Sequence, residues 1–290
     1  MLFRSVSTYF DGVYRISTKL NDTTVLKYGI DDGLLSLKDN YITKIENRIV
    51  FGNEKGLLYF DSIYQRFRPE TRFGKEFCNG KIGVYRIEKS ANNFYWFSLF
   101  NNDKKWVERG YFDSVGNYVR DTLPFKRLPN EQFDAIYHDT DGITWLGSSS
   151  GLYSYNPNVN VDYYKPYHTL VRKVITINDS VLFWGTNYTT DSAGHHTVAL
   201  EQPAELIPVL DYKFNDLTFE FAAPYFIEEK KTEYSYLLEG YKDTWSKWNT
   251  EPKAVFTNLR EGEYSFKVKA KNIYGIESTV AEYRFSIIPP

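Results

Sequence analysis

The sequence has little cysteine, histidine or methionine, and it has no long apolar run. Cys78 is the single cysteine, so no disulfide can form within the chain, and a single thiol is compatible with cytoplasm or periplasm. The apolar runs comprise a handful of residues, far fewer than the about 20 that cross a bilayer, and the start Met-Leu-Phe-Arg lacks the long apolar stretch of a signal peptide. We therefore predict no membrane-spanning segment within this sequence.

The sequence also has little excess of either charge, since its net charge is −2, and lysine and arginine form no block. A balanced, dispersed charge does not recruit nucleic acid or anionic lipid. We expect neither as a partner of this chain.

The patterns that carry catalysis or bind metals and cofactors are missing as well. No Gly-x-Ser-x-Gly turn presents a nucleophile, and no glycine-rich phosphate or dinucleotide loop occurs. His195 and His196 are the only histidine cluster, but adjacent residues of a strand point to opposite faces and cannot easily ligate one ion. Asp139 and Asp141 fit a turn, where aspartate binds backbone amides. We predict no catalytic residue, no metal site and no cofactor.

Aromatic residues, in contrast, are abundant, with 25 tyrosines and 21 phenylalanines. Aromatic-rich chains punctuated by turns are mostly all-β, and 290 residues suffice for two domains with separate cores. The stretch from Asn156 to Pro166 has the proline and asparagine content of a linker. We therefore place a domain boundary between residues 1–165 and 166–290.

Glycines that enter aromatic, strand-like runs recur through the first half of the chain. They are Gly12, Gly56, Gly110 and Gly151. The intervals between them are 44, 54 and 41 residues, close to the about 40 to 50 residues of one four-stranded propeller blade. This spacing predicts blades.

The best-formed unit of this repeat covers residues 133–157. It predicts a strand, an Asp-Gly hairpin turn at 141–142, a strand that carries Trp145, a second glycine turn and a third strand. A looser copy covers residues 32–57, a poor one follows at 94–107, and the run at 2–6 has the composition of a strand in mid-blade. We expect Trp145, and Trp184 further on, to serve packing.

The last ninety residues predict a β-sandwich. Residues 233–238 and 263–271 alternate polar residues with aromatic or branched ones, the period of strands with one buried face. Tyr264 follows the turn at 258–262, as in a tyrosine corner, where the hydroxyl binds backbone upstream. We expect Trp245 and Trp248 in the sandwich core. Earlier strands are predicted at 174–177, 181–185, 197–200 and 217–221, with a long loop at 187–194.

Two stretches resemble known families. Residues 139–152 resemble the two-component regulator propeller repeat, whose pattern is Asp-x-x-Gly-x-x-Trp-x-Gly-(Thr/Ser)-x-x-Gly-Leu. Residues 234–270 resemble the Y_Y_Y domain, found at the end of the periplasmic sensor region of bacterial two-component regulators, although Phe256 stands where that family often has tyrosine. The matching residues are Tyr234, Tyr236, Leu238, Glu239, Gly240, Trp245, Asn258, Leu259, Gly262, Tyr264, Phe266, Val268 and Ala270.

These resemblances imply an all-β chain in two parts. The first is a partial β-propeller of about three to four blades, the C-terminal part of a longer propeller, and the second is an immunoglobulin/fibronectin-III-like β-sandwich. This is the order found in the periplasmic sensor region of a hybrid two-component system regulator of the Bacteroidetes type. A part-propeller can instead close on another copy or form an open stack with exposed edges.

The resemblance also implies a function. Such regulators detect oligosaccharides released from polysaccharides. The propeller region would bind the oligosaccharide, and the sandwich would relay a change in homodimer geometry. A membrane helix, expected beyond Pro289 and Pro290, would pass it to a histidine kinase outside this chain. By this resemblance the chain is periplasmic, the extracytoplasmic part of an inner-membrane protein, and itself no enzyme.

For the ligand, Trp106 and Arg109 are the candidate binding residues, with Lys104 and Lys105 beside them. An aromatic face suits a sugar ring, and charged groups suit its hydroxyls and carboxylates. The alternative for the same residues is a strand aromatic surrounded by solvated charges.

Two other functions stay open at this point. The chain could be a carbohydrate-active propeller enzyme, a lyase or glycosidase, with an accessory sandwich, and a cleft with two or more carboxylates of raised pKa would favour it. It could also be a structural or dimerisation fragment whose ligand site lies on missing blades. Binding by a longer protein but not by residues 1–290 would select that function.

Overall fold

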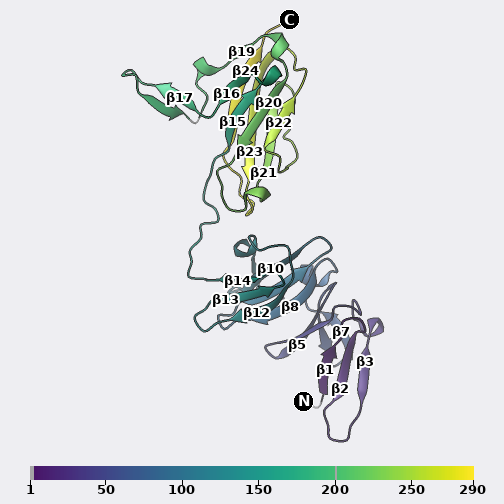
Figure 1. Ribbon diagram of the computed structural model, residues 1–290. Coiled ribbons are helices and arrows are strands. Elements are labelled where there is room, and N and C mark those ends of the chain that lie inside the picture. The colour runs from purple at the N-terminus through teal and green to yellow at the C-terminus, as the bar shows by residue number, and fades with distance from the viewer. Residues whose placement is uncertain (1–2, 200) are drawn as a thin grey trace. The chain divides into compact units, whose positions relative to one another are not determined.

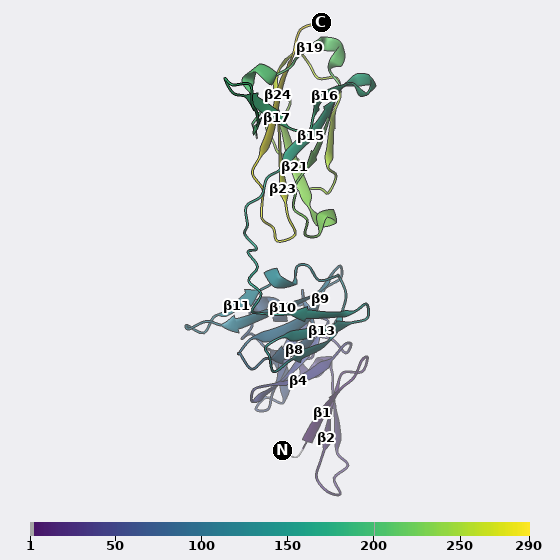
Figure 2. The ribbon, with the colours of Figure 1, turned by 60° about the vertical axis from the view of Figure 1, so that its left-hand side comes forward.

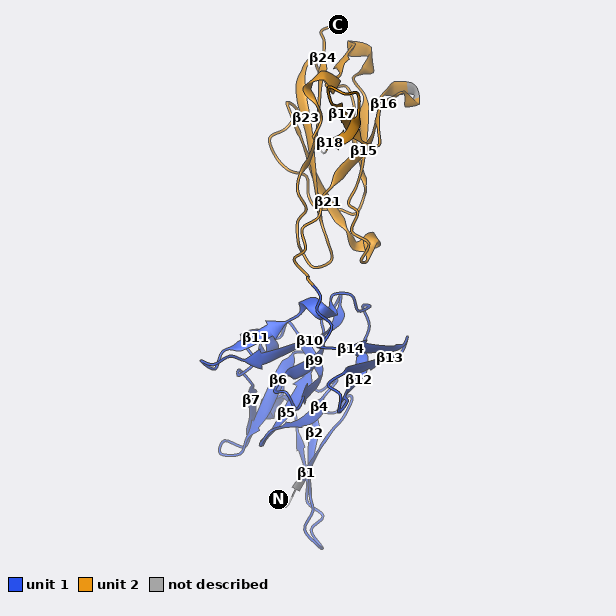
Figure 3. Cartoon of the chain, turned by 90° about the vertical axis from the view of Figure 1, so that its left-hand side faces the viewer, with its two compact units in different colours: residues 1–161 blue, residues 162–290 orange. Residues whose placement is uncertain are grey.

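The structure, a computed structural model, describes residues 3–199 and 201–290. The chain divides between Val161 and Asp162 into two compact units (Figure 3). This division lies four residues before the predicted boundary. Residues 2 and 200, which the predicted strands included, lie outside the described residues. The prediction of an all-β fold is confirmed, since helix occurs in the described part only as short 3-10 turns.

Unit 1 consists of antiparallel sheets whose strands follow one another in chain order (Figure 1). The first sheet contains β1 (Phe3–Ser7), β2 (Val13–Ser17) and β3 (Val25–Tyr28), and the second contains β4 (Tyr41–Ile45), β5 (Arg48–Asn53), β6 (Gly56–Asp61) and β7 (Arg66–Pro69). The third contains β8 (Gly83–Lys89), β9 (Tyr95–Phe100), β10 (Lys105–Phe112) and β11 (Tyr118–Asp121), and the fourth contains β12 (Phe133–His138), β13 (Thr144–Ser148) and β14 (Leu152–Tyr155). Its 3-10 turns are η1 (Ile30–Asp32), η2 (Lys75–Cys78) and η3 (Leu123–Phe125).

Turn residues explain why the fourth sheet forms where the repeat predicted it. Gly142 adopts φ +88°, and the Asp139 amide donates to the Ile143 carbonyl across the hairpin, at 2.8 Å. The Ser148 amide donates to the Gly151 carbonyl in the second turn. For Gly110 the repeat predicted a glycine at the start of a strand. Gly110 instead lies inside β10, where a Cβ would meet the Tyr118 ring at 2.4 Å.

The sheets of unit 1 stack face to face, with an apolar cluster between each neighbouring pair. Phe51 and Phe67 belong to the cluster between the first two sheets, Phe97 to the next, and Trp96 with Phe133 to the last. The first strands of successive sheets, β1, β4, β8 and β12, contact one another in turn. This is how blades pack around a channel, while the predicted number of three to four blades stays a prediction.

Unit 2 is a sandwich of two four-stranded sheets (Figure 2). One sheet has the order β16 (Val181–Trp184), β15 (Leu170–Ile175), β20 (Leu217–Ala222), β22 (Lys253–Phe256). The other has the order β19 (Val209–Leu210), β24 (Ala281–Ile287), β23 (Gly262–Lys271), β21 (Glu233–Glu239). The 3-10 turns are η4 (Ile177–Asp179), η5 (Ala204–Leu206), η6 (Tyr212–Phe214) and η7 (Glu229–Lys231).

Aromatic stacking across the two sheets forms the core of the sandwich. Phe219 of β20 stacks on Phe266 of β23, with ring centroids 4.0 Å apart. The tyrosine corner is confirmed, because the buried Tyr264 donates from its hydroxyl to the Arg260 carbonyl at 2.8 Å. The period-2 pattern of β23 thus places its apolar residues inward, as the sequence predicted.

The prediction that Trp245 and Trp248 belong to the core is wrong. Trp245 is 37% exposed, and Nζ of Lys269 lies 5.0 and 5.3 Å from the two indole centroids. The cause is segment 246–249, whose amides pair with carbonyls of β21 along the edge of that sheet. The indoles therefore cover the outer face of β23, where lysine stems give them apolar contact.

Two further predictions for unit 2 are wrong. Residues 187–190 form a strand, β17 (Asn187–Thr190), rather than part of a loop, and it pairs with β18 (His196–Ala199) in a hairpin that projects from the sandwich in Figure 1. Trp184 is not packed inside. It is 69% exposed on the edge strand β16, with Nζ of Lys173 4.6 Å from its ring centroid.

Candidate functional site

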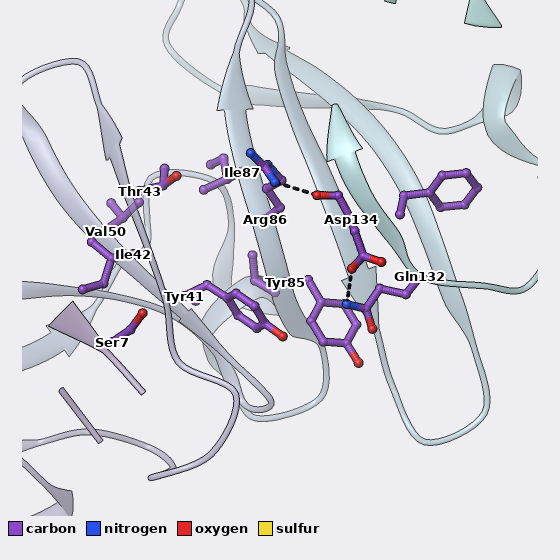
Figure 4. A pocket seen from close by; sticks show the side chains of 13 residues that line it. Ser7, Tyr41, Ile42, Thr43, Val50, Tyr85, Arg86, Ile87, Gln132 and Asp134 are labelled. Carbon is purple, nitrogen blue, oxygen red and sulfur yellow. Dashed lines mark hydrogen bonds between the residues drawn. The ribbon is translucent and has the colours of Figure 1, made fainter. Parts of the chain in front are cut away.

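A pocket of about 270 Å³ opens in unit 1 over the first strands of the stacked sheets (Figure 4). Tyr41 comes from β4, Tyr85 and Arg86 from β8, and Gln132 and Asp134 from β12 and the residue before it. Ser7 of β1 completes the lining. Because first strands of neighbouring sheets contact each other, residues from four sheets meet here. The pocket thus depends on how the sheets stack.

An aromatic pair forms one wall of the pocket. The Tyr85 ring stacks on Phe100 of β9 with centroids 3.9 Å and planes 19° apart, and the Tyr41 ring stands edge-on to Tyr85 at 5.4 Å. Gly83 pairs with Phe100, and a Cβ there would lie 2.4 Å from the Phe100 ring. Its missing side chain therefore lets Phe100 cross β8 to reach Tyr85.

The phenol hydroxyls of Tyr41 and Tyr85 are partly buried and lie near carboxylates. Burial raises the pKa of both Tyr41 and Tyr85, and the neighbouring carboxylates Asp39 and Asp134 raise it further. Both phenols therefore stay protonated at neutral pH. Each can donate one hydrogen bond and accept others.

Arg86, Gln132 and Asp134 form the polar wall of the pocket, and hydrogen bonds hold them in place. Arg86 Nη1 donates to the backbone carbonyl of Asp134 at 2.6 Å, which ties β8 to β12, and Gln132 Nε2 donates to Asp134 Oδ1 at 2.5 Å. Figure 4 shows both bonds beside the tyrosine rings. The Arg86 side chain is further held by an ion pair with Glu88. The guanidinium is thus engaged with the protein itself.

A second pocket, of about 440 Å³, shares Gln132 and Asp134 with the first. We call the two pockets together the inner groove. The lining of the second pocket is polar throughout and comprises Asn101, Asn102, Asp103, Lys104, Lys105, Asn130, Glu131, Gln132, Asp134 and Ser149.

Asn130 joins the two loops that build the second pocket. Its Oδ1 accepts from the Lys105 amide at 2.7 Å, and its Nδ2 donates to the Asp103 carbonyl at 3.1 Å. Glu131 is likewise anchored, since hydroxyls of Ser148 and Ser150 donate to its Oε1. These hydroxyls lower the pKa of Glu131, the opposite of what a general acid requires.

The structure does not bring together the two residues that the sequence singled out. Trp106 and Arg109 both lie on β10, but they are three residues apart and point to opposite faces. Trp106 packs toward the cluster between the second and third sheets, and its Nε1 donates to Glu108 Oε2 at 2.9 Å. As ligand-binding residues, both stay a prediction.

Arg109 points into the opposite interface and is 9% exposed. Its Nε donates to Asp121 Oδ2 at 2.8 Å, and its guanidinium carbon lies 4.1 Å from the Phe94 ring centroid and 4.5 Å from that of Tyr155. The residue thus joins the third sheet to the fourth. Of the predicted cluster, Lys104 and Lys105 line the inner groove.

The described residues contain no group of three or more His, Cys, Asp or Glu side chains that could hold a metal ion. His195 Nδ1 contacts Asp191 Oδ2, and His196 Nδ1 contacts Thr190 Oγ1, both at 3.0 Å on the β17–β18 hairpin. Nor does any helix within residues 3–199 and 201–290 have the length and apolar character needed to cross a membrane.

Sequence reasoning missed Tyr41, Tyr85, Gln132 and Asp134. These residues lie in separate repeats, and only the stacking of first strands brings them together. One signal was available, because each belongs to or precedes the first strand of a repeat unit, where a propeller exposes side chains to its channel. Aligning the repeats by their first strands would have selected them.

Comparison with known proteins identifies the class of one part of the chain. Residues 226–289 match the family model of the Y_Y_Y domain, which confirms the resemblance seen in the sequence. This part of the sandwich is a Y_Y_Y domain. No curated protein matches the chain.

Solved structures extend the comparison to the whole chain. The extracellular domain of the hybrid two-component system BT3049 from B. thetaiotaomicron is similar with a TM-score of 0.56 and 18% identity, over 96% of this chain and 42% of that one. The chain therefore has the fold of that domain and spans less than half its length. The extracellular domain of a second such system, BT4673, gives a TM-score of 0.34 at 17% identity, over 98% of this chain and 34% of that one.

Proposed function

We propose that this chain is the periplasmic sensor and signal-transmitting part of a hybrid two-component regulator that responds to oligosaccharides. One observation carries the proposal: stacked meander sheets precede a Y_Y_Y domain in a chain that shares its fold with the extracellular domain of such a system. The histidine kinase would then belong to domains outside this chain, beyond a membrane helix that follows Pro290.

In this proposal the oligosaccharide binds unit 1 and the sandwich relays the signal within a homodimer. A ligand shifts an equilibrium only when it binds one arrangement more tightly than the other. The inner groove suits this requirement, because its lining comes from four sheets and a ligand there would sense how those sheets are stacked. The sandwich is built around one continuous cluster of buried apolar residues.

Binding without catalysis is the function that the groove supports best. Its first pocket has an aromatic wall, and Glu131 in the second has a lowered pKa. A glycosidase would need a carboxylic acid whose pKa is raised, and the pKa of Glu131 is lowered, so a carbohydrate-active enzyme stays a second candidate. A purely structural fragment is the other alternative.

The full-length regulator that contains this chain tests the proposal. Reconstituted in vesicles, it should change its rate of autophosphorylation when a digest of one particular polysaccharide is added on the sensor side, while digests of unrelated polysaccharides should have no effect. An unchanged rate with every member of a broad panel would contradict the sensor function.

A further inference from the structure

We propose that the inner groove binds an uncharged oligosaccharide, with one sugar ring against the tyrosine wall and its hydroxyls on Gln132, Asp134 and the asparagines of the second pocket. This inference rests on the proposed sensor function and names the class of ligand and its site. It follows from three properties of the groove, which are its charge, its aromatic wall and its two-part shape.

The charges of the inner groove balance. Lys104 and Lys105 stand against Asp103, Glu131 and Asp134 in the second pocket. The cation of the first pocket, Arg86, is paired with Glu88 and bonded to a backbone carbonyl. A sulfated or uronic-acid sugar would need cations in excess of carboxylates. The groove offers an anion no such excess of cations, and an uncharged ligand needs none.

The tyrosine wall offers what a sugar ring needs. The Tyr85 ring is fixed by stacking on Phe100 and by its T-shaped contact with Tyr41. It therefore loses little further side-chain entropy when a ligand binds. The apolar C–H face of a pyranose packs on such a ring, and the two phenol groups can exchange hydrogen bonds with its hydroxyls. Both tyrosines are half-buried and line the pocket.

The polar side chains match hydroxyl groups rather than charges. Gln132 and Asp134 are already oriented by their mutual hydrogen bond, and Asp134 is exposed, so its carboxylate can accept from neighbouring sugar hydroxyls. Asn101 and Asn130 add amides. Asn101 is held by the Lys104 amide within its own loop, and Asn130 by backbone groups of the facing loop. Amides both donate and accept, which is the pattern of a hydroxyl.

The shape of the groove favours several linked sugars. Two pockets of about 270 and 440 Å³ meet at Gln132 and Asp134, and together they fall in the range of roughly 300 to 1,000 Å³ typical of ligand sites. One pocket has the aromatic wall and the other is polar throughout. A chain of sugars that crosses the shared residues would use both.

Isothermal titration calorimetry of residues 1–290 tests this inference directly. The probes are neutral oligosaccharides from glucan, mannan, xylan and arabinan, and acidic ones from pectin and heparin. The variants are Tyr85→Ala and Gln132→Ala, and Trp184→Ala is the control because it removes an aromatic ring that is 69% exposed and lies in unit 2. Urea unfolding of each variant shows that it is folded, and Gln132, half-buried at a strand entrance, can be changed with little effect on packing.

We expect one class of neutral oligosaccharide to bind, with an affinity that added salt leaves unchanged. Tyr85→Ala and Gln132→Ala should each weaken binding by about tenfold or more, and Trp184→Ala should keep it within about twofold. Tighter, salt-sensitive binding of an acidic oligosaccharide would overturn the inference. So would neutral binding that both groove variants leave intact, or no neutral binding at all.

The failure of this inference can be separated from that of the sensor function. If the full-length regulator responds to an oligosaccharide that residues 1–290 do not bind, the groove assignment is wrong. The regulator is then still a sensor, but its ligand site lies outside this chain. If residues 1–290 bind a neutral oligosaccharide through the groove but the full-length regulator never responds, the groove assignment stands and the sensor function is wrong.

Discussion

The ring of Phe100 lies directly over Gly83 and stacks on Tyr85, with centroids 3.9 Å apart. The aromatic wall of the inner groove therefore depends on a position without a side chain. Gly83 needs no unusual backbone angle for this, only the space that a Cβ would fill.

Gly83→Ala should weaken both the groove and the fold. The new methyl group would lie 2.4 Å from the Phe100 ring, so the ring must move and Tyr85 loses its support. We expect a destabilisation of about 1–3 kcal/mol, measured by urea unfolding, and weaker oligosaccharide binding. Gly151→Ala is the matched control, because its Cβ would meet its nearest neighbour at an ordinary 3.8 Å. Equal effects of the two substitutions would refute the role of Gly83.

Arg120→Ala should destabilise unit 1 strongly. Glu108 is fully buried, and it accepts from Arg120 Nε at 2.7 Å and Nη2 at 2.5 Å. Removal of the guanidinium leaves a buried carboxylate without its cation, which costs about 3–5 kcal/mol. Hydrogen–deuterium exchange of peptides from β8 to β11 reports the loss. The exposed Arg127→Ala should change little, and a similarly small effect of Arg120→Ala would contradict the prediction.

Tyr264→Phe should remove the hydrogen bond of the tyrosine corner while keeping the ring in the core. The lost bond to the Arg260 carbonyl predicts a destabilisation of about 1 kcal/mol. Exchange of peptides from residues 226–289 in increasing urea measures it. Tyr241→Phe, at a position that is 52% exposed, should stay within about 0.5 kcal/mol of the wild type. If Tyr264→Phe left the free energy of unfolding unchanged, packing alone would hold the corner.

Alkaline pH should destabilise the sandwich through Tyr283. Burial raises the pKa of this phenol from 10.0 to about 12, so the folded state keeps its proton where the unfolded state releases it. Its contribution, on the order of 2 kcal/mol, is fully present below pH 10 and is lost as pH rises from there to about 12. Urea midpoints of unit 2 across this interval test the slope. Tyr283→Phe should reduce the slope, while the raised pKa values of Tyr167, Tyr234 and Tyr264 keep the rest of it. An unchanged slope would assign the whole effect to these other groups.

The sequence was most informative where local chemistry decides the structure. Three such features each depend on residues close together in the chain, and the elements that they predicted are present. They are the left-handed backbone of Gly142, the alternation along β23 and the position of Tyr264 after its turn. The same local reasoning failed for Trp245, because a segment pairing with the edge of β21 holds this indole on the outer face.

The candidate site could not be predicted in this way. Tyr41, Tyr85 and Gln132 are separated by more than forty residues each, and their meeting depends on how separate sheets stack. Arg109 shows the converse, since a charged residue beside lysines in the sequence turns out to be buried against Phe94 and Tyr155. Which face of a strand meets solvent depends on its neighbouring sheets, and the sequence of β10 alone does not define them.

The most direct test measures whether the signal depends on ligand binding in the inner groove. It is the oligosaccharide titration of autophosphorylation by the full-length regulator with Tyr85→Ala, compared with the wild type and with Trp184→Ala. We predict that Tyr85→Ala shifts the half-maximal concentration upward by about tenfold, while Trp184→Ala follows the wild type in basal rate, maximal rate and half-maximal concentration. A titration curve that Tyr85→Ala leaves in place would contradict the claim that this groove receives the signal.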